Sequence, residues 1–107
     1  MKLVLNNKEY EITYCNTFFK RLKGLMFTKK VTEQILLFPR CNSVHTFFMF
    51  QNIDIIMTDK NYNIKYKFKE VSPWKIIFPK KNIYYTFEFS TCLNLNLDKI
   101  KTLQIKM

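Results

Sequence analysis

The feature that most constrains the fold is a segment in which apolar and charged side chains alternate one by one. In residues 64–69, isoleucine and aromatic residues alternate with Lys65, Lys67 and Lys69. A strand sends successive side chains to opposite faces, whereas a helix repeats every 3.6 residues, so this period predicts a strand with one lysine face. Residues 10–14 and 84–89 alternate in the same way. The chain is therefore predicted to be built mainly from short strands.

Most other segments fit this prediction. Short apolar stretches at residues 3–5, 35–38, 44–50, 53–58 and 103–106 are separated by polar or proline-containing turns. One segment differs, because residues 17–23 place apolar side chains at helical spacing, after a capping Asn16-Thr17 and before Gly24, the single glycine. We expect a mainly β (α+β) fold: a small compact β-barrel or sandwich-like domain, with one short helix near the N-terminus. All of residues 1–107 would form this single domain.

The charge is strongly positive, with 18 basic and 8 acidic residues and a net charge of +10. Seven lysines and one glutamate lie in residues 60–81, and the candidate contacts for a polyanion are Lys65, Lys67, Lys69, Lys80 and Lys81. An edge strand protected by lysine would have the same pattern. Only two of the basic residues are arginines, whereas readers of phosphates and bases commonly use arginine. Nucleic-acid binding is therefore the weaker of these two interpretations.

Several classes of protein are not indicated. No apolar segment approaches the roughly 20 residues of a membrane-spanning helix, and the apolar start is too short for a signal peptide, which predicts a cytoplasmic protein. Three cysteines without a Cys-x-x-Cys pair favour reduced thiols over disulfides or a zinc ribbon. The lack of a glycine-rich loop excludes a phosphate-cradling motif. We expect no cofactor and no metal.

Four motifs together form an uncommon combination. They are Arg-Leu-Lys-Gly-Leu-Met at residues 21–26, His-Thr-Phe-Phe-Met at 45–49, Ile-Asp-Ile-Ile at 53–56 and Tyr-Thr-Phe-Glu-Phe at 85–89. Their order and spacing resemble the domain-of-unknown-function 192 family of prokaryotes, from about Cys15 to the C-terminus. The segments at residues 41–45 and 73–76 resemble its branch in low-GC Gram-positive bacteria. The resemblance implies a small β-rich domain with a short early helix and no assigned enzymatic activity.

The polar residues shared with this family pattern are Arg21, His45, Asp54 and Glu88, which we take as candidate pocket or functional residues. Asp54 interrupts an apolar segment, so its carboxylate needs a basic or backbone N–H partner. It would serve either a structural role or a pocket shared with Arg21 or His45. Glu88 is expected to be exposed, because the phenylalanines on either side of it should face the core.

A catalytic or metal site has weaker support. Cys41 and His45 have a spacing that places them on one face of a strand, and with Asp54 they could form a small hydrolase or metal site. A zinc ion would need further ligands, and a histidine among aromatic residues is more often structural. We assign no catalytic residue, and an enzyme is not the favoured interpretation.

The candidate interaction surface is an unbroken apolar run. A strand formed by the run would be apolar on both faces, so one face needs a partner unless the strand is wholly internal. The run consists of Phe47, Phe48, Met49 and Phe50, and Met26 adds further adaptable apolar surface. The first hypothesis is a non-enzymatic binding or accessory module that uses them to hold a protein or small-molecule ligand. Polyanion binding and the Cys/His site are the alternatives.

Overall fold

The computed structural model describes residues 2–5, 8–14, 35–45, 52–90, 96–100 and 103–106, with the backbone alone at His45, Ser90 and Lys99. These residues form ten strands and one 3-10 turn. In chain order they are β1(Lys2–Leu5), β2(Lys8–Glu11), β3(Thr13–Tyr14), β4(Ile35–Pro39), β5(Val44–His45), β6(Ile53–Thr58), β7(Ile64–Val71), β8(Ile76–Ile77), β9(Tyr85–Ser90), η2(Leu97–Lys99) and β10(Gln104–Lys106).

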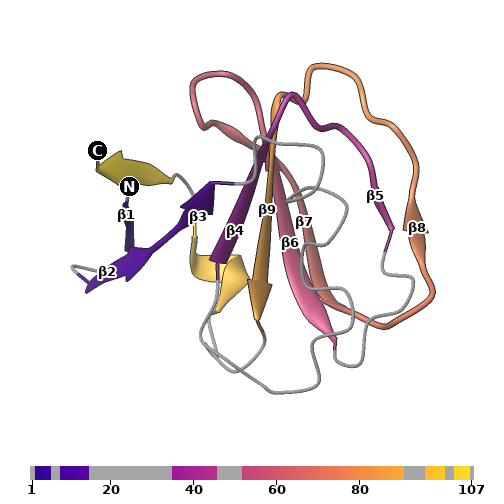
Figure 1. Cartoon of the computed structure of the whole chain (residues 1–107), viewed down its shortest axis with the longest axis horizontal. Helices are drawn as coiled ribbons and strands as arrows, with labels where there is room; N and C mark the ends of the chain where they lie inside the picture. The colour runs from indigo at the N-terminus through magenta and orange to yellow at the C-terminus, as the bar shows by residue number, and fades with distance from the viewer. Residues whose placement is uncertain are drawn as a thin grey trace.

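The strands form three sheets (Figure 1). The central sheet has the order β3-β4-β9-β6-β7, and all its pairs are antiparallel except β3 with β4. The order β10-β1-β2 forms a terminal sheet near both chain ends, and β5 pairs with β8 in a two-stranded ribbon on the opposite side of the view. The prediction of a mainly β fold is confirmed. The barrel is wrong, because β3 and β7 remain open edges of the central sheet among the strands that the structure describes.

Two apolar cores cover the two faces of the central sheet. The first core joins it to the terminal sheet and to η2, through Leu3, Leu37, Ile56, Phe87 and Leu97. The second core joins the opposite face to the β5–β8 ribbon, through Leu36, Phe38, Ile55, Met57 and Ile77. Both faces of β4, β6 and β9 are therefore buried. This explains why residues 53–58 read as a continuous apolar strand with few polar interruptions.

The predicted positions of several strands agree with the structure, notably residues 53–58. Residues 10–14 divide between β2 and β3, which belong to different sheets. The predicted helix at residues 17–23 lies outside the described residues. Within the described ranges, the only helical element is η2, where Asn96 Oδ1 accepts a hydrogen bond of 3.2 Å from the Asp98 N–H.

The one-sided lysine face predicted for residues 64–69 is wrong. The pairing of β6 with β7 shifts register between Met57 and Thr58 and again between Ile53 and Ile55. Each irregularity changes which face the following side chains meet. Ile64 consequently packs against the first core and Phe68 against the second. Lys67 turns toward η2, where its Nζ donates to the Leu97 carbonyl at 2.7 Å.

Candidate functional site

Asp54 lies on β6, between β9 and β7, and accepts a hydrogen bond at an irregularity of β7. It is 5% exposed, and its Oδ1 accepts a hydrogen bond of 2.8 Å from the backbone N–H of Glu70. Glu70 has a positive φ of 51° at the register shift between β6 and β7. Burial raises the pKa of Asp54, and the Glu70 N–H opposes that rise. The sequence predicted either a basic side chain or a backbone N–H as the partner of this carboxylate, and the hydrogen bond found comes from a backbone N–H.

Glu88 is buried, so the expectation of an exposed side chain is wrong. It lies on β9 opposite Leu36 of β4 and Ile55 of β6, and it is 3% exposed. Alternation along β9 does place Phe87 and Phe89 in the first core, but the second core covers the other face as well. Within the described part of the chain, Glu88 Oε2 has no hydrogen-bond partner. Burial raises the pKa of Glu88 to about 8, which favours the protonated carboxyl group at neutral pH.

The two acids do not meet. Asp54 pairs with Phe89 and Glu88 pairs with Ile55, so the two acids are one position out of register on adjacent strands. Ile53 and Ile55 belong to the second core, which leaves Asp54 on the face of the first core, opposite Glu88. Arg21 lies outside the described residues, as does the side chain of His45. The structure thus separates two of the four candidate polar residues.

Cys41 also belongs to a different environment from Asp54. Its side chain packs against the second core, and its Sγ donates to the Ser43 carbonyl at 3.1 Å. Asp54 is on the opposite face of the sheet, so the two cannot form one reactive site. Among the described residues, no group of three or more His, Cys, Asp and Glu side chains could hold a metal ion.

The exposed apolar side chains gather elsewhere, along the segment that contains β8. Trp74, Ile76 and Phe78 are 60%, 51% and 69% exposed, and we call these three residues the β8 strip. They are spaced two apart, while the intervening Ile77 packs into the second core. Ile76 and Phe78 therefore point outward from the β8 segment, and Trp74 is exposed on the turn that precedes it, where its φ is 65°. Sequence reasoning missed it because Ser72-Pro73-Trp74 resembles a turn, although large apolar residues at every second position between Pro73 and Pro79 are a usable signal.

The lysines predicted to contact a polyanion are in varied settings. Lys65 lies 3.9 Å from Asp59 Oδ2, and Lys67 is bound to Leu97 as described above. Lys69 and Lys81 are exposed, and Lys80 places its Nζ 5.5 Å from the centre of the Tyr66 ring. The residues predicted as an interaction surface, Met26 and Phe47 to Phe50, lie outside the described residues.

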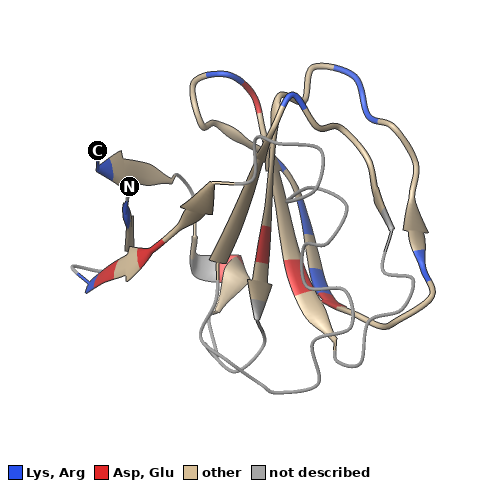
Figure 2. Ribbon diagram, in the orientation of Figure 1, with Lys and Arg blue, Asp and Glu red and all other residues tan. Residues whose placement is uncertain are grey.

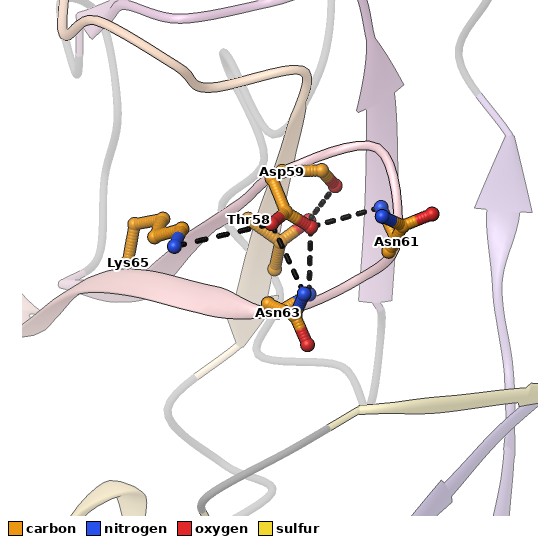
Figure 3. A network of polar contacts seen from close by, with 5 residues as sticks. All are labelled: Thr58, Asp59, Asn61, Asn63 and Lys65. Carbon is orange, nitrogen blue, oxygen red and sulfur yellow. Dashed lines mark hydrogen bonds and ion pairs between the residues drawn. The ribbon is translucent and has the colours of Figure 1, made fainter.

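The turn between β6 and β7 holds the densest polar network described (Figure 3). Asp59 Oδ1 accepts the backbone N–H groups of Asn61 and Asn63 at 2.8 and 3.0 Å, and Oδ2 accepts the side-chain amide of Asn63 at 3.1 Å. These bonds lower the pKa of Asp59 below its ordinary value. An aspartate that binds the backbone two and four residues ahead closes a turn, and this role accounts for the whole network.

The fold and the motifs define a small β-rich domain of an uncharacterised class. The chain belongs to the DUF192 family (Uncharacterized ACR), which it matches over residues 1–107. A UPF0127 protein of Pyrococcus horikoshii is 36% identical over 84 residues, which are 75% of this chain and 72% of that protein. A UPF0127 protein of Thermococcus sibiricus is 35% identical over 82 residues, 72% of this chain and 53% of that protein. The match thus spans about half of the Thermococcus protein.

These curated relatives are archaeal, so they lend no support to a low-GC Gram-positive branch. Two solved structures share the fold. A Novosphingobium aromaticivorans protein of unknown function aligns with a TM-score of 0.76 at 13% identity, covering 99% of this chain and 82% of its own. A Sinorhizobium meliloti protein described as a candidate transcription regulator aligns with a TM-score of 0.75 at 14% identity, covering 98% and 89%. Among the described residues, no helix has the length and apolarity to cross a membrane.

Proposed function

We propose that this chain is a non-enzymatic binding or accessory module and that the β8 strip is its binding surface. One observation carries the proposal: three large apolar side chains within residues 74–78 are more than half exposed. Single exposed apolar residues are ordinary on a protein surface, but adjacent ones on the same face are typical of interaction sites. The strip consists of other residues than the surface predicted from sequence, which lies outside the described residues.

The placement of the buried acids supports a role without catalysis. Asp54 holds a strand irregularity, and Glu88 is enclosed between apolar neighbours on the other face. Acid–base catalysis by a pair of groups requires both within hydrogen-bond reach of one substrate. Two acids on opposite faces of a sheet do not satisfy that requirement, so we assign both to the structure of the domain. A cytoplasmic location stays a prediction from the sequence.

The proposal can be tested with anilinonaphthalene sulfonate, a dye that combines an aromatic body with an anionic group. We expect the folded protein to enhance the dye's emission and to transfer excitation to it from Trp74, the single tryptophan. Substitution of both Ile76→Ser and Phe78→Ser should abolish the enhancement, because the apolar contact is lost. The matched control is Tyr66→Ser, which removes an exposed aromatic side chain outside the strip. Equal dye binding by the double variant and the control would refute the proposal.

A second candidate function is polyanion binding. Residues 60–81 carry seven lysines and one glutamate, and Lys69 and Lys81 are exposed. Binding to heparin or to a nucleic acid should then weaken steeply as salt rises, because each neutralised phosphate releases counterions. The double substitution Lys69→Gln and Lys81→Gln should flatten that salt dependence, while Phe78→Ser should leave it unchanged. Lack of retention on heparin at low salt would remove this candidate.

A further inference from the structure

We infer that the partner of the β8 strip is the surface of an anionic lipid bilayer, an inference that rests on the proposed function. The juxtaposition behind it is an exposed apolar strip within a segment whose only charges are positive. The domain would bind the membrane from one side, with the ends of a few side chains inserted and every strand outside the hydrocarbon.

The first argument is the composition and position of the strip. Trp74, Ile76 and Phe78 all lie in a short segment, and within the described residues β8 pairs with β5 at two positions, Val44 with Ile77 and His45 with Ile76. Figure 1 shows this ribbon at the outer side of the molecule, away from the terminal sheet. Apolar side chains on an outlying ribbon can enter the boundary between headgroups and acyl chains without disturbing the core. Tryptophan is particularly suited to that boundary, because its ring is apolar and its N–H is polar.

The second argument is charge. Lys75, Lys80 and Lys81 lie in or beside the segment, and the sequence has no acidic residue between Glu70 and Glu88. Figure 2 shows basic residues along this side of the molecule. Lysine can lay its methylene stem along apolar surface while its amine remains with the anionic headgroups. Such lysines strengthen attachment to acidic lipids, whereas a neutral bilayer offers them nothing comparable.

The charge also argues against other partners. A second copy of this chain would bring the same lysines face to face in a symmetric contact, and like charges oppose one another. A nucleic acid would neutralise the lysines, and aromatic side chains could stack on its bases. The aliphatic Ile76, however, is 51% exposed in the free protein and has no ring to stack on a base, so a nucleic acid would not explain its exposure. An anionic bilayer satisfies the apolar and the basic side chains together.

The experiment uses vesicles of phosphatidylcholine alone and vesicles of phosphatidylcholine mixed with phosphatidylserine. The protein should sediment with the mixed vesicles only, and the emission of Trp74 should shift to shorter wavelength as its ring leaves water. Phe78→Ser should weaken the partition coefficient about tenfold or more, from the apolar surface it no longer buries. The double variant Lys80→Gln and Lys81→Gln should weaken it by roughly fivefold for each lysine.

The charge-matched control is Lys8→Gln with Lys106→Gln, which makes the same charge change in the terminal sheet. Both variant pairs keep a side chain of similar length at exposed or half-buried positions, and circular dichroism is to check that each variant is folded. Equal loss of vesicle binding in control and test pairs would overturn the inference, as would equal binding to neutral vesicles. If the protein binds the dye but no vesicles, the bilayer is not the partner, and the β8 strip remains a binding surface. If it binds neither, the proposed function is refuted as well. Salt-sensitive nucleic-acid binding without any vesicle binding would make a polyanion the partner instead.

Discussion

Asp54 and Glu88 occupy neighbouring strands one position out of register, so their carboxyl groups leave the central sheet on opposite faces. Each face is covered by an apolar core, so both carboxyl groups are buried, but they differ in their hydrogen-bond partners. Asp54 gains a backbone N–H donor, whereas Glu88 is left with an unpartnered oxygen among the described residues and a raised pKa. The two acids therefore give separable contributions to stability.

Glu88 should make the protein less stable as the pH rises. Its pKa is about 8 in the folded chain, against an ordinary value of 4.5. Between those values the folded state keeps a proton that the unfolded state has lost, so the stabilising contribution is complete below pH ~4.5 and is lost as the pH rises toward ~8. The slope would approach ~1.4 kcal/mol per pH unit. Glu88→Gln should remove this slope in urea unfolding curves measured at several pH values.

The matched control for that measurement is Glu11→Gln, which changes an exposed glutamate on β2. It should retain the pH dependence of the natural protein. Parallel stability curves for the natural chain and Glu88→Gln would show that Glu88 ionises freely in the folded state.

Asp54 should stabilise the domain through its acceptor rather than through its charge. Asp54→Asn keeps an oxygen for the Glu70 N–H and relieves a buried ionisable group, so its free energy of unfolding should stay within ~1 kcal/mol of the natural value. Asp54→Ala leaves the Glu70 N–H without its acceptor and should lower the free energy of unfolding by ~1–3 kcal/mol. Chemical denaturation checks both values, and faster amide exchange at Glu70 in the alanine variant would locate the damage. Equal losses from both substitutions would contradict the assignment.

Much of the central sheet could be predicted from alternation and apolar runs, because β6, β7 and β9 have short segments of clear pattern between polar turns. The errors came from features that a linear pattern does not carry. Glu88 was expected to be exposed because its neighbours face a core. That expectation holds only for a strand with one solvent-exposed face, and β9 is covered on both faces. The faces of β7 were misassigned because an irregularity depends on pairing with β6. The β8 strip was overlooked because it begins in the turn at Ser72-Pro73-Trp74, which drew attention away from the apolar residues that follow.

The turn at Asp59 should depend on its carboxylate oxygen atoms. Asp59→Asn retains an acceptor for the backbone N–H groups of Asn61 and Asn63, whereas Asp59→Ala retains none. The expected order of melting temperatures is natural chain, then the asparagine variant, then the alanine variant. Because the pKa of Asp59 is lowered, its contribution is present above the ordinary value of 3.8 and is lost as the pH falls below it. Differences in melting temperature that persist unchanged at strongly acidic pH would be inconsistent with this role.

Thr86 ties β9 to the segment that leads toward the ribbon. Its Oγ1 donates to the Cys41 carbonyl at 2.9 Å, and the residue is 0% exposed. Thr86→Val keeps the volume but removes the donor, and it should cost ~1 kcal/mol of unfolding free energy. Thr86→Ser is the matched variant that keeps the hydroxyl while removing a methyl group. A valine variant as stable as the natural protein would show that this bond contributes nothing net.

The most direct test of the β8 strip as a binding surface is the quenching of Trp74 by brominated lipids. Since Trp74 is the single tryptophan, its emission reports the strip alone. In phosphatidylcholine–phosphatidylserine vesicles, the account predicts quenching by bromine attached to the acyl chains near the headgroups. It also predicts that Lys80→Gln with Lys81→Gln reduces that quenching. Vesicle binding that leaves the emission of Trp74 unquenched would place the membrane contact elsewhere and contradict the account.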